Sequence, residues 1–99
     1  MKKTIATLAL ILVAGSAQAT VSQDNQSFIK GMLTKVGVQS MWSGPNSLWI
    51  KKPASINSKM ELETLGYGIC DATRGAGFYV VTFWHSLSGQ GQITKVKCG

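Results

Sequence analysis

Acidic side chains are scarce in this chain of 99 residues, which has four Asp and Glu residues against ten Lys and Arg residues. The resulting net charge of +6 at pH 7 favours anionic partners and disfavours strongly basic ones. Glu61 and Glu63 are only two positions apart, so a helix would point them in different directions, and they make a poor general acid and base pair. The sequence therefore offers no paired carboxylates for catalysis.

Histidine is rarer still, with one residue in the chain. His85 stands at the end of a predicted strand, where a lone histidine is more typical of a solvated side chain than of a catalyst. No second metal ligand stands at a recognisable spacing from it, and the glycines near Gly75 and Gly89 fit turns better than a phosphate-binding loop. We predict no catalytic residue, no metal ion and no cofactor, and therefore a non-enzymatic protein. An enzyme would require Asp71 or Glu63 to reach His85 in the fold.

No apolar run is long enough for a membrane span, because the run from Ile5 to Ala14 is shorter than the roughly 20 residues required. It follows Lys2 and Lys3 and precedes Ala17-Gln18-Ala19, a combination typical of a bacterial secretory signal peptide. We predict cleavage after Ala19, which leaves a single domain of residues 20–99 without a membrane span. The domain is expected in the periplasm or outside the cell, with a net charge of +4 from eight Lys and Arg residues and four Asp and Glu residues.

The chain has two cysteines, Cys70 and Cys98. Two cysteines in a small exported domain most often form a disulfide, whereas in the cytosol they would suggest metal or redox chemistry. Chain-entropy reasoning for a loop of this length gives about 3 to 4 kcal/mol of stabilisation. Because an oxidised pair has no thiolate, the same pairing excludes a cysteine nucleophile and a Cys-His metal site.

Hydrophobic periodicity predicts a helix, a hairpin, a second helix and a second hairpin. The first helix ends near Gly37, and its apolar face consists of Phe28, Ile29, Met32, Leu33 and Val36. The first hairpin pairs 38–42 with 47–52 around the turn 43–46. A four-residue loop at this turn would place Trp42 and Trp49 on one face and Met41, Leu48 and Ile50 on the other.

The second helix is predicted from a capping box, in which Ser58 and Glu61 satisfy each other's amide groups, and should extend towards Arg74. Gly66 and Gly68 weaken this prediction because each costs about 1 kcal/mol in a helix interior, unless the backbone packs unusually close to a sheet. A strand over residues 62–70 is the alternative.

The run 78–85 is the longest β-branched and aromatic stretch, and it predicts the central strand, with 92–98 as its hairpin partner. The expected fold is therefore a small α+β domain, with one antiparallel sheet covered by helices on one face and one disulfide. Alternation places Tyr79, Val81 and Phe83 on the same face as Cys98, beneath the helices.

The other face of this hairpin is then open. Its predicted binding residues are Phe78, Val80, Trp84, Ile93, Lys95 and Lys97. An exposed apolar patch rimmed by charge is a common mark of a binding surface, and the partner expected here is an envelope protein or an anionic envelope component. Two alternative covers for this face are the first hairpin and a second copy of the chain in a homodimer. Export disfavours a nucleic-acid partner. The alternative function is a secreted effector, toxin or inhibitor.

The export signal leads to a first prediction. The mature protein should begin at Thr20 and be released by osmotic shock, because the Ala17-Gln18-Ala19 ending fits signal peptidase. Intact mass spectrometry of the released protein measures this directly. A species that retains Met1 in the membrane fraction would contradict it.

Overall fold

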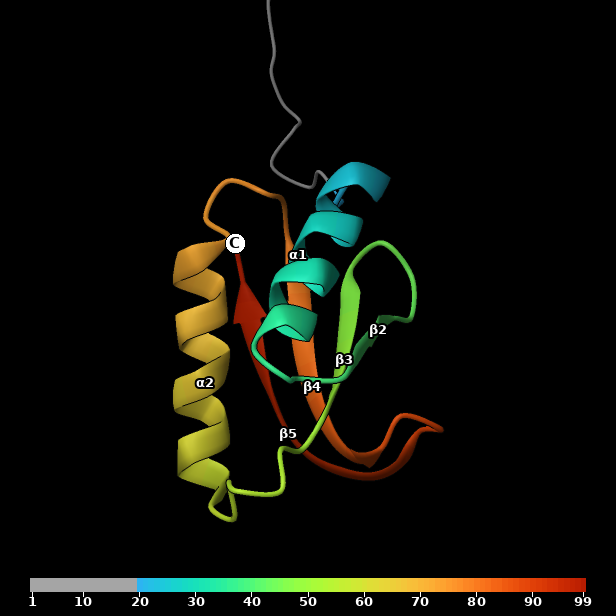
Figure 1. Cartoon of the computed structure of the whole chain (residues 1–99). Helices are drawn as coiled ribbons and strands as arrows, with labels where there is room; N and C mark the ends of the chain where they lie inside the picture. The colour runs from blue at the N-terminus through green and yellow to red at the C-terminus, as the bar shows by residue number, and fades with distance from the viewer. Residues whose placement is uncertain (1–19) are drawn as a thin grey trace, which may run out of the picture.

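The structure is a computed structural model that describes residues 20–99, so the predicted export signal lies outside the described residues. The elements are α1 (Gln23–Lys35), β2 (Ser40–Trp42), β3 (Ser47–Lys51), α2 (Lys59–Ala72), β4 (Tyr79–Ser86) and β5 (Gln90–Cys98). Their order agrees with the predicted order of helix, hairpin, helix and hairpin (Figure 1). Neither helix of the described range is long and apolar enough to cross a membrane.

The four strands form one sheet in the order β2-β3-β4-β5. The two hairpin pairs are antiparallel, but β3 and β4 are parallel, so the prediction of a purely antiparallel sheet was wrong. The reason is that α2 connects β3 to β4. A strand pair joined by a crossover helix runs parallel, because the helix carries the chain back to the end at which it started.

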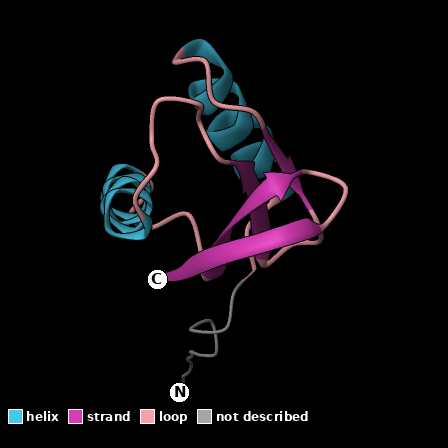
Figure 2. Cartoon of the chain, turned by 90° about the horizontal axis from the view of Figure 1, so that it is seen from below, coloured by secondary structure: helices cyan, strands magenta, loops and turns pink. Residues whose placement is uncertain are grey.

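Both helices lie on the same side of the sheet (Figures 1 and 2). Each begins at a serine whose side chain accepts a hydrogen bond from a helix amide, Ser22 from Asn25 and Ser58 from Glu61. Buried side chains of both helices and of the sheet form one core between the layers: Val21, Ile29, Leu33, Val38, Leu48, Ile50, Leu62, Ile69, Tyr79, Val81, Phe83 and Cys98.

Residues 62–70 are helical, which excludes the strand alternative. The packing around Gly66 explains why a glycine occurs at that position of the helix. The residue is buried, and a Cβ atom at this position would lie 2.9 Å from Val96 Cγ2 and 3.3 Å from Phe83 Cε2. The backbone of α2 therefore rests directly on the side chains of the sheet. Gly68 faces open space, with nothing within 4 Å of such an atom.

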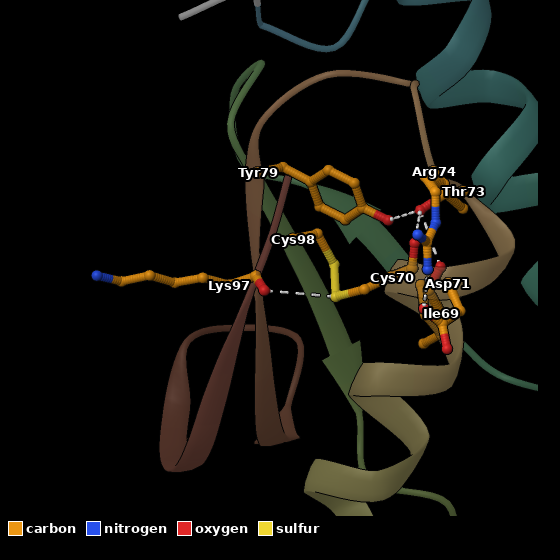
Figure 3. Close-up of a disulfide and its surroundings, with 8 residues drawn as sticks. All are labelled: Ile69, Cys70, Asp71, Thr73, Arg74, Tyr79, Lys97 and Cys98. Carbon is orange, nitrogen blue, oxygen red and sulfur yellow. Dashed lines mark hydrogen bonds and ion pairs between the residues drawn. A yellow bond between two sulfur atoms is a disulfide. The ribbon is translucent and has the colours of Figure 1, made fainter. Parts of the chain in front are cut away.

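The predicted disulfide between Cys70 and Cys98 is present, with the two Cα atoms 4.9 Å apart (Figure 3). It joins the last turn of α2 to the end of β5 and closes a separation of 28 residues. Next to it, the Thr73 hydroxyl shares a buried hydrogen bond with the Tyr79 hydroxyl. Burial raises the pKa of Tyr79, and this hydrogen bond lowers it in part, so the phenol is held as a neutral group in the core.

The apolar face predicted for the first helix is only partly buried. Ile29 and Leu33 enter the core, whereas Phe28 is 66% exposed and Val36, at the C-terminal cap, is 71% exposed. A helix that rests on one sheet buries a single stripe, and Phe28 lies on its outer side.

The faces predicted for the first hairpin were also wrong. Trp42 pairs with Leu48, and Met41 pairs with Trp49, so Trp42 and Trp49 point to opposite sides. The cause is the turn: the Ser43 amide donates to the Ser47 carbonyl, which leaves a three-residue loop instead of four. A change of one residue in loop length moves every side chain of a strand to the other face relative to its partner.

The disulfide leads to a second prediction. Cys98→Ser should lower the free energy of unfolding by about 2 to 5 kcal/mol, the usual cost of losing a native disulfide from a small secreted domain. Urea denaturation of the oxidised protein and of the variant measures the difference. If both thiols of the folded, exported protein react freely with an alkylating reagent, the bond is absent.

The close approach at Gly66 leads to a third prediction, in which Gly68 is the matched control. Gly66→Ala should destabilise the protein by about 1 to 3 kcal/mol, because Val96 and Phe83 must move to admit the methyl group. Gly68→Ala should stabilise it by up to about 1 kcal/mol, because alanine favours the helix and meets nothing. Urea midpoints that shift in the same direction for both variants would show that α2 does not rest on the sheet as described.

Candidate binding face

The sheet face turned away from the helices is the candidate site, and we call it the open face. Figure 3 shows the side chain of Lys97 extending away from the disulfide and α2, which fixes the direction of this face. Because side chains alternate along a strand and paired residues share a face, the register assigns the rest. The open face consists of Met41, Ser47, Trp49, Lys51, Val80, Thr82, Trp84, Gln92, Lys95 and Lys97.

These side chains form rows across the sheet. One row runs from Trp49 through Thr82 to Lys95, and the next from Lys51 to Trp84. Adjacent residues in such rows lie about 5 Å apart, so Lys51 and Trp84 are close enough for one ligand to touch an ammonium group and an indole ring. Trp49 and Lys95 are two strands apart, with Thr82 between them. The parallel pairing of β3 with β4 creates the rows, because it brings the tryptophans of the two hairpins together.

Trp49 and Trp84 are in contact at the centre of the open face. Their ring centroids are 4.7 Å apart and their planes are tilted by 46°, an arrangement favoured by aromatic pairs. The β4–β5 turn closes over one side, since a Cβ atom on Gly89 would lie 3.4 Å from the Trp49 ring. The Trp84 indole N–H is buried and finds no hydrogen-bond partner within residues 20–99. Trp84 is half-buried, and the exposed part of its indole belongs to the ring carbons and not to the N–H group.

The acidic side chains are confined to one side of the molecule, whereas lysines occur on both. The open face carries Lys51, Lys95 and Lys97, and all three are exposed. All four acidic side chains of the chain belong to the helices, Asp24 to α1 and the other three to α2. The open face is therefore cationic, with no carboxylate among its own side chains to neutralise it.

Of the predicted binding residues, Val80, Trp84, Lys95 and Lys97 lie together on the open face. Phe78 precedes β4 and is 38% exposed, at the margin of the sheet beside Gly99. Ile93 does not join them, because it packs against the core.

A β-bulge explains the position of Ile93. Phe83 pairs with Thr94 and Trp84 pairs with Gln92, which leaves Ile93 as an extra residue without a partner in β4. A bulge interrupts strict alternation, so residues before and after it cannot be assigned to faces by one count. The prediction of Ile93 as a member of the binding face was therefore wrong.

Six residues of the open face were not among the predicted binding residues: Met41, Ser47, Trp49, Lys51, Thr82 and Gln92. The two that matter most for binding are Trp49 and Lys51. Alternation along β3 does place them on one side of that strand, and this signal was present. Alternation could not show that β4 lies next to β3, because the parallel pairing of these strands depends on the crossover through α2.

Within residues 20–99, His85 forms no ion pair with an acidic side chain. It is exposed and lies against Gly91, where an added Cβ atom would be 2.8 Å from the Cδ2 atom of His85. The two acids considered for it are used elsewhere: Asp71 pairs with Arg74 at 2.7 Å, and Glu63 accepts a hydrogen bond from Thr94. Within residues 20–99, no three His, Cys, Asp or Glu side chains lie close enough to hold a metal ion.

Comparisons with protein-family models, with curated proteins and with solved structures find no match.

Proposed function

We propose that this protein is an exported, non-enzymatic binding protein that holds an anionic component of the bacterial envelope on its open face. The observation that carries the proposal is the placement of the acids: the tryptophan pair is flanked by three lysines, while every acidic side chain belongs to the helices. Such a face attracts anions from solution and repels basic surfaces.

The two kinds of side chain have different roles in this proposal. Trp49 and Trp84 provide a rigid apolar surface, on which truncation of one ring typically costs more than about 1 kcal/mol of binding free energy. Lys51, Lys95 and Lys97 lie around this surface and are solvated, so they increase the association rate and set the salt dependence more than the affinity at high salt. An envelope protein with an acidic patch would use the same features, and it is the second candidate for the ligand.

Compartment is a part of the proposal. A disulfide in a small domain fits an oxidising space such as the periplasm or the cell exterior. Fractionation distinguishes an accessory protein that stays in the periplasm from an effector, toxin or inhibitor that is released.

The proposed function leads to a fourth prediction, tested with lipopolysaccharide and phosphatidylglycerol vesicles as anionic probes. Trp84→Ala should raise the Kd at least about fivefold, the equivalent of about 1 kcal/mol, whereas Trp84→Phe should retain most of the affinity because it keeps a ring. Lys95→Glu with Lys97→Glu should weaken binding most at low ionic strength, where screening is least. Isothermal titration at two salt concentrations measures both effects.

Matched controls distinguish an effect of the open face on binding from an effect of net charge or of unfolding. Lys30→Glu with Lys59→Glu changes the net charge equally, but these lysines belong to the helices and should leave binding much less affected. Neutral phosphatidylcholine vesicles should not bind. If no anionic probe binds but a periplasmic protein co-purifies in a Trp84-dependent manner, the ligand is the second candidate. If Trp84→Ala unfolds the domain, Trp84 is a core residue and the proposed binding face is wrong.

A further inference from the structure

The outer side of α1 carries apolar surface that the fold leaves uncovered. In Figure 1 this helix passes in front of β4, and its Ile29 and Leu33 side chains belong to the core against the sheet, so the other side of the helix faces outwards. Phe28 projects from the outer side, and beside it lies a hollow of about 320 Å³. The hollow is lined by Ser27, Phe28, Gly31, Met32 and Lys35.

Two neighbouring rows of side chains, each with a spacing of four residues, make up this surface. Asp24, Phe28 and Met32 form a ridge, and Ser27, Gly31 and Lys35 form a groove beside it. The groove is deepest at Gly31, where an added Cβ atom would meet nothing within 4 Å. Ridges of this spacing on one helix pack into grooves of the same spacing on another.

The two rows complement each other when the helix meets a copy of itself. In an antiparallel pair of α1 helices centred between Ile29 and Lys30, Phe28 lies opposite the partner's Gly31, and Met32 opposite the partner's Ser27. The ridge of each copy then enters the groove of the other, which is the self-complementary arrangement that two-fold symmetry requires.

The charges at the ends of the rows agree with the same pairing. Asp24 falls opposite the partner's Lys35, and Lys35 opposite the partner's Asp24, about 8 Å from the centre on either side at a rise of about 1.5 Å per residue. Within residues 20–99, neither Asp24 nor Lys35 takes part in an ion pair. Both are exposed, so the two pairs can form without breaking a contact inside one copy.

We propose that the protein forms a two-fold symmetric homodimer through the outer side of α1, with Phe28 of each copy seated over the partner's Gly31. The interface lies on the opposite side of the molecule from the open face, so a dimer presents two such faces outwards. One helix per copy makes a small interface, and the expected Kd is weak, roughly 10 µM to 1 mM.

Sedimentation velocity on the oxidised protein, expressed as the full chain and measured up to about 1 mM, gives the Kd of the dimer. Phe28→Ser should abolish association, and its exposure means that the monomer should remain folded by circular dichroism. Gly31→Leu should also abolish association by filling the groove, yet raise the midpoint of thermal unfolding by about 4 °C because leucine favours the helix. Loss of the dimer in a more stable variant distinguishes the interface from a folding defect.

Charge exchange tests the register. Asp24→Lys and Lys35→Asp should each raise the Kd at least about tenfold, because each places like charges opposite one another at two symmetric positions. The double variant should return to within about threefold of the original value, although both substitutions oppose the helix dipole. Lys30→Glu, outside both rows, should not weaken association.

Three results would overturn the proposal. They are a protein that remains monomeric at about 1 mM, a dimer that is insensitive to Phe28→Ser, and a dimer disrupted by Trp84→Ala in place of Phe28→Ser. The third result would mean that copies associate through the open face instead.

Discussion

The contact of α2 with β5 is the constraint on which the rest of the structure depends. Three ties follow one another along the two elements: the Glu63 carboxylate to the Thr94 hydroxyl, Gly66 against Val96, and the Cys70–Cys98 disulfide. Each step of three or four residues in the helix matches a step of two in the strand, since both span about 5 to 7 Å. The helix is therefore fixed alongside the edge strand, and it covers one face of the sheet while the other face stays open.

Helix formation and surface charge are connected in this chain. Asp24 and Glu61 each lie in the first turn of a helix, where a carboxylate stabilises the exposed amide groups. The other two acids, Glu63 and Asp71, lie further along α2, where Glu63 accepts a hydrogen bond from Thr94 and Asp71 pairs with Arg74. Because all four acids belong to the helices, lysines are the charged residues of the sheet, and the open face is cationic.

Elements could be predicted from the sequence where local chemistry determines them. The capping serine Ser58 marked the start of the second helix, and an exported pair of cysteines indicated the disulfide. A glycine inside this helix was expected only if the backbone packs close to a sheet, and Gly66 is the residue at which it does.

What could not be predicted depends on single-residue differences in register or on contacts remote in sequence. The loop at 44–46 and the extra residue Ile93 each change a face assignment, and neither leaves a mark in the hydrophobic pattern. The parallel pairing of β3 with β4 joins residues more than thirty positions apart, and it alone placed Trp49 beside Trp84. The candidate site was thus half predictable: its β4–β5 part followed from alternation, and its β3 part required the crossover.

The tryptophan pair also has a consequence for how folding can be followed. Each hairpin can form from contacts close in sequence, but Trp49 and Trp84 meet only when the two hairpins are joined through the centre of the sheet. Two indoles at this separation couple their electronic transitions, which produces a paired band in circular dichroism that a lone tryptophan does not give. The chain therefore contains its own spectroscopic reporter, which is silent while the hairpins are separate and appears in the step that completes the open face.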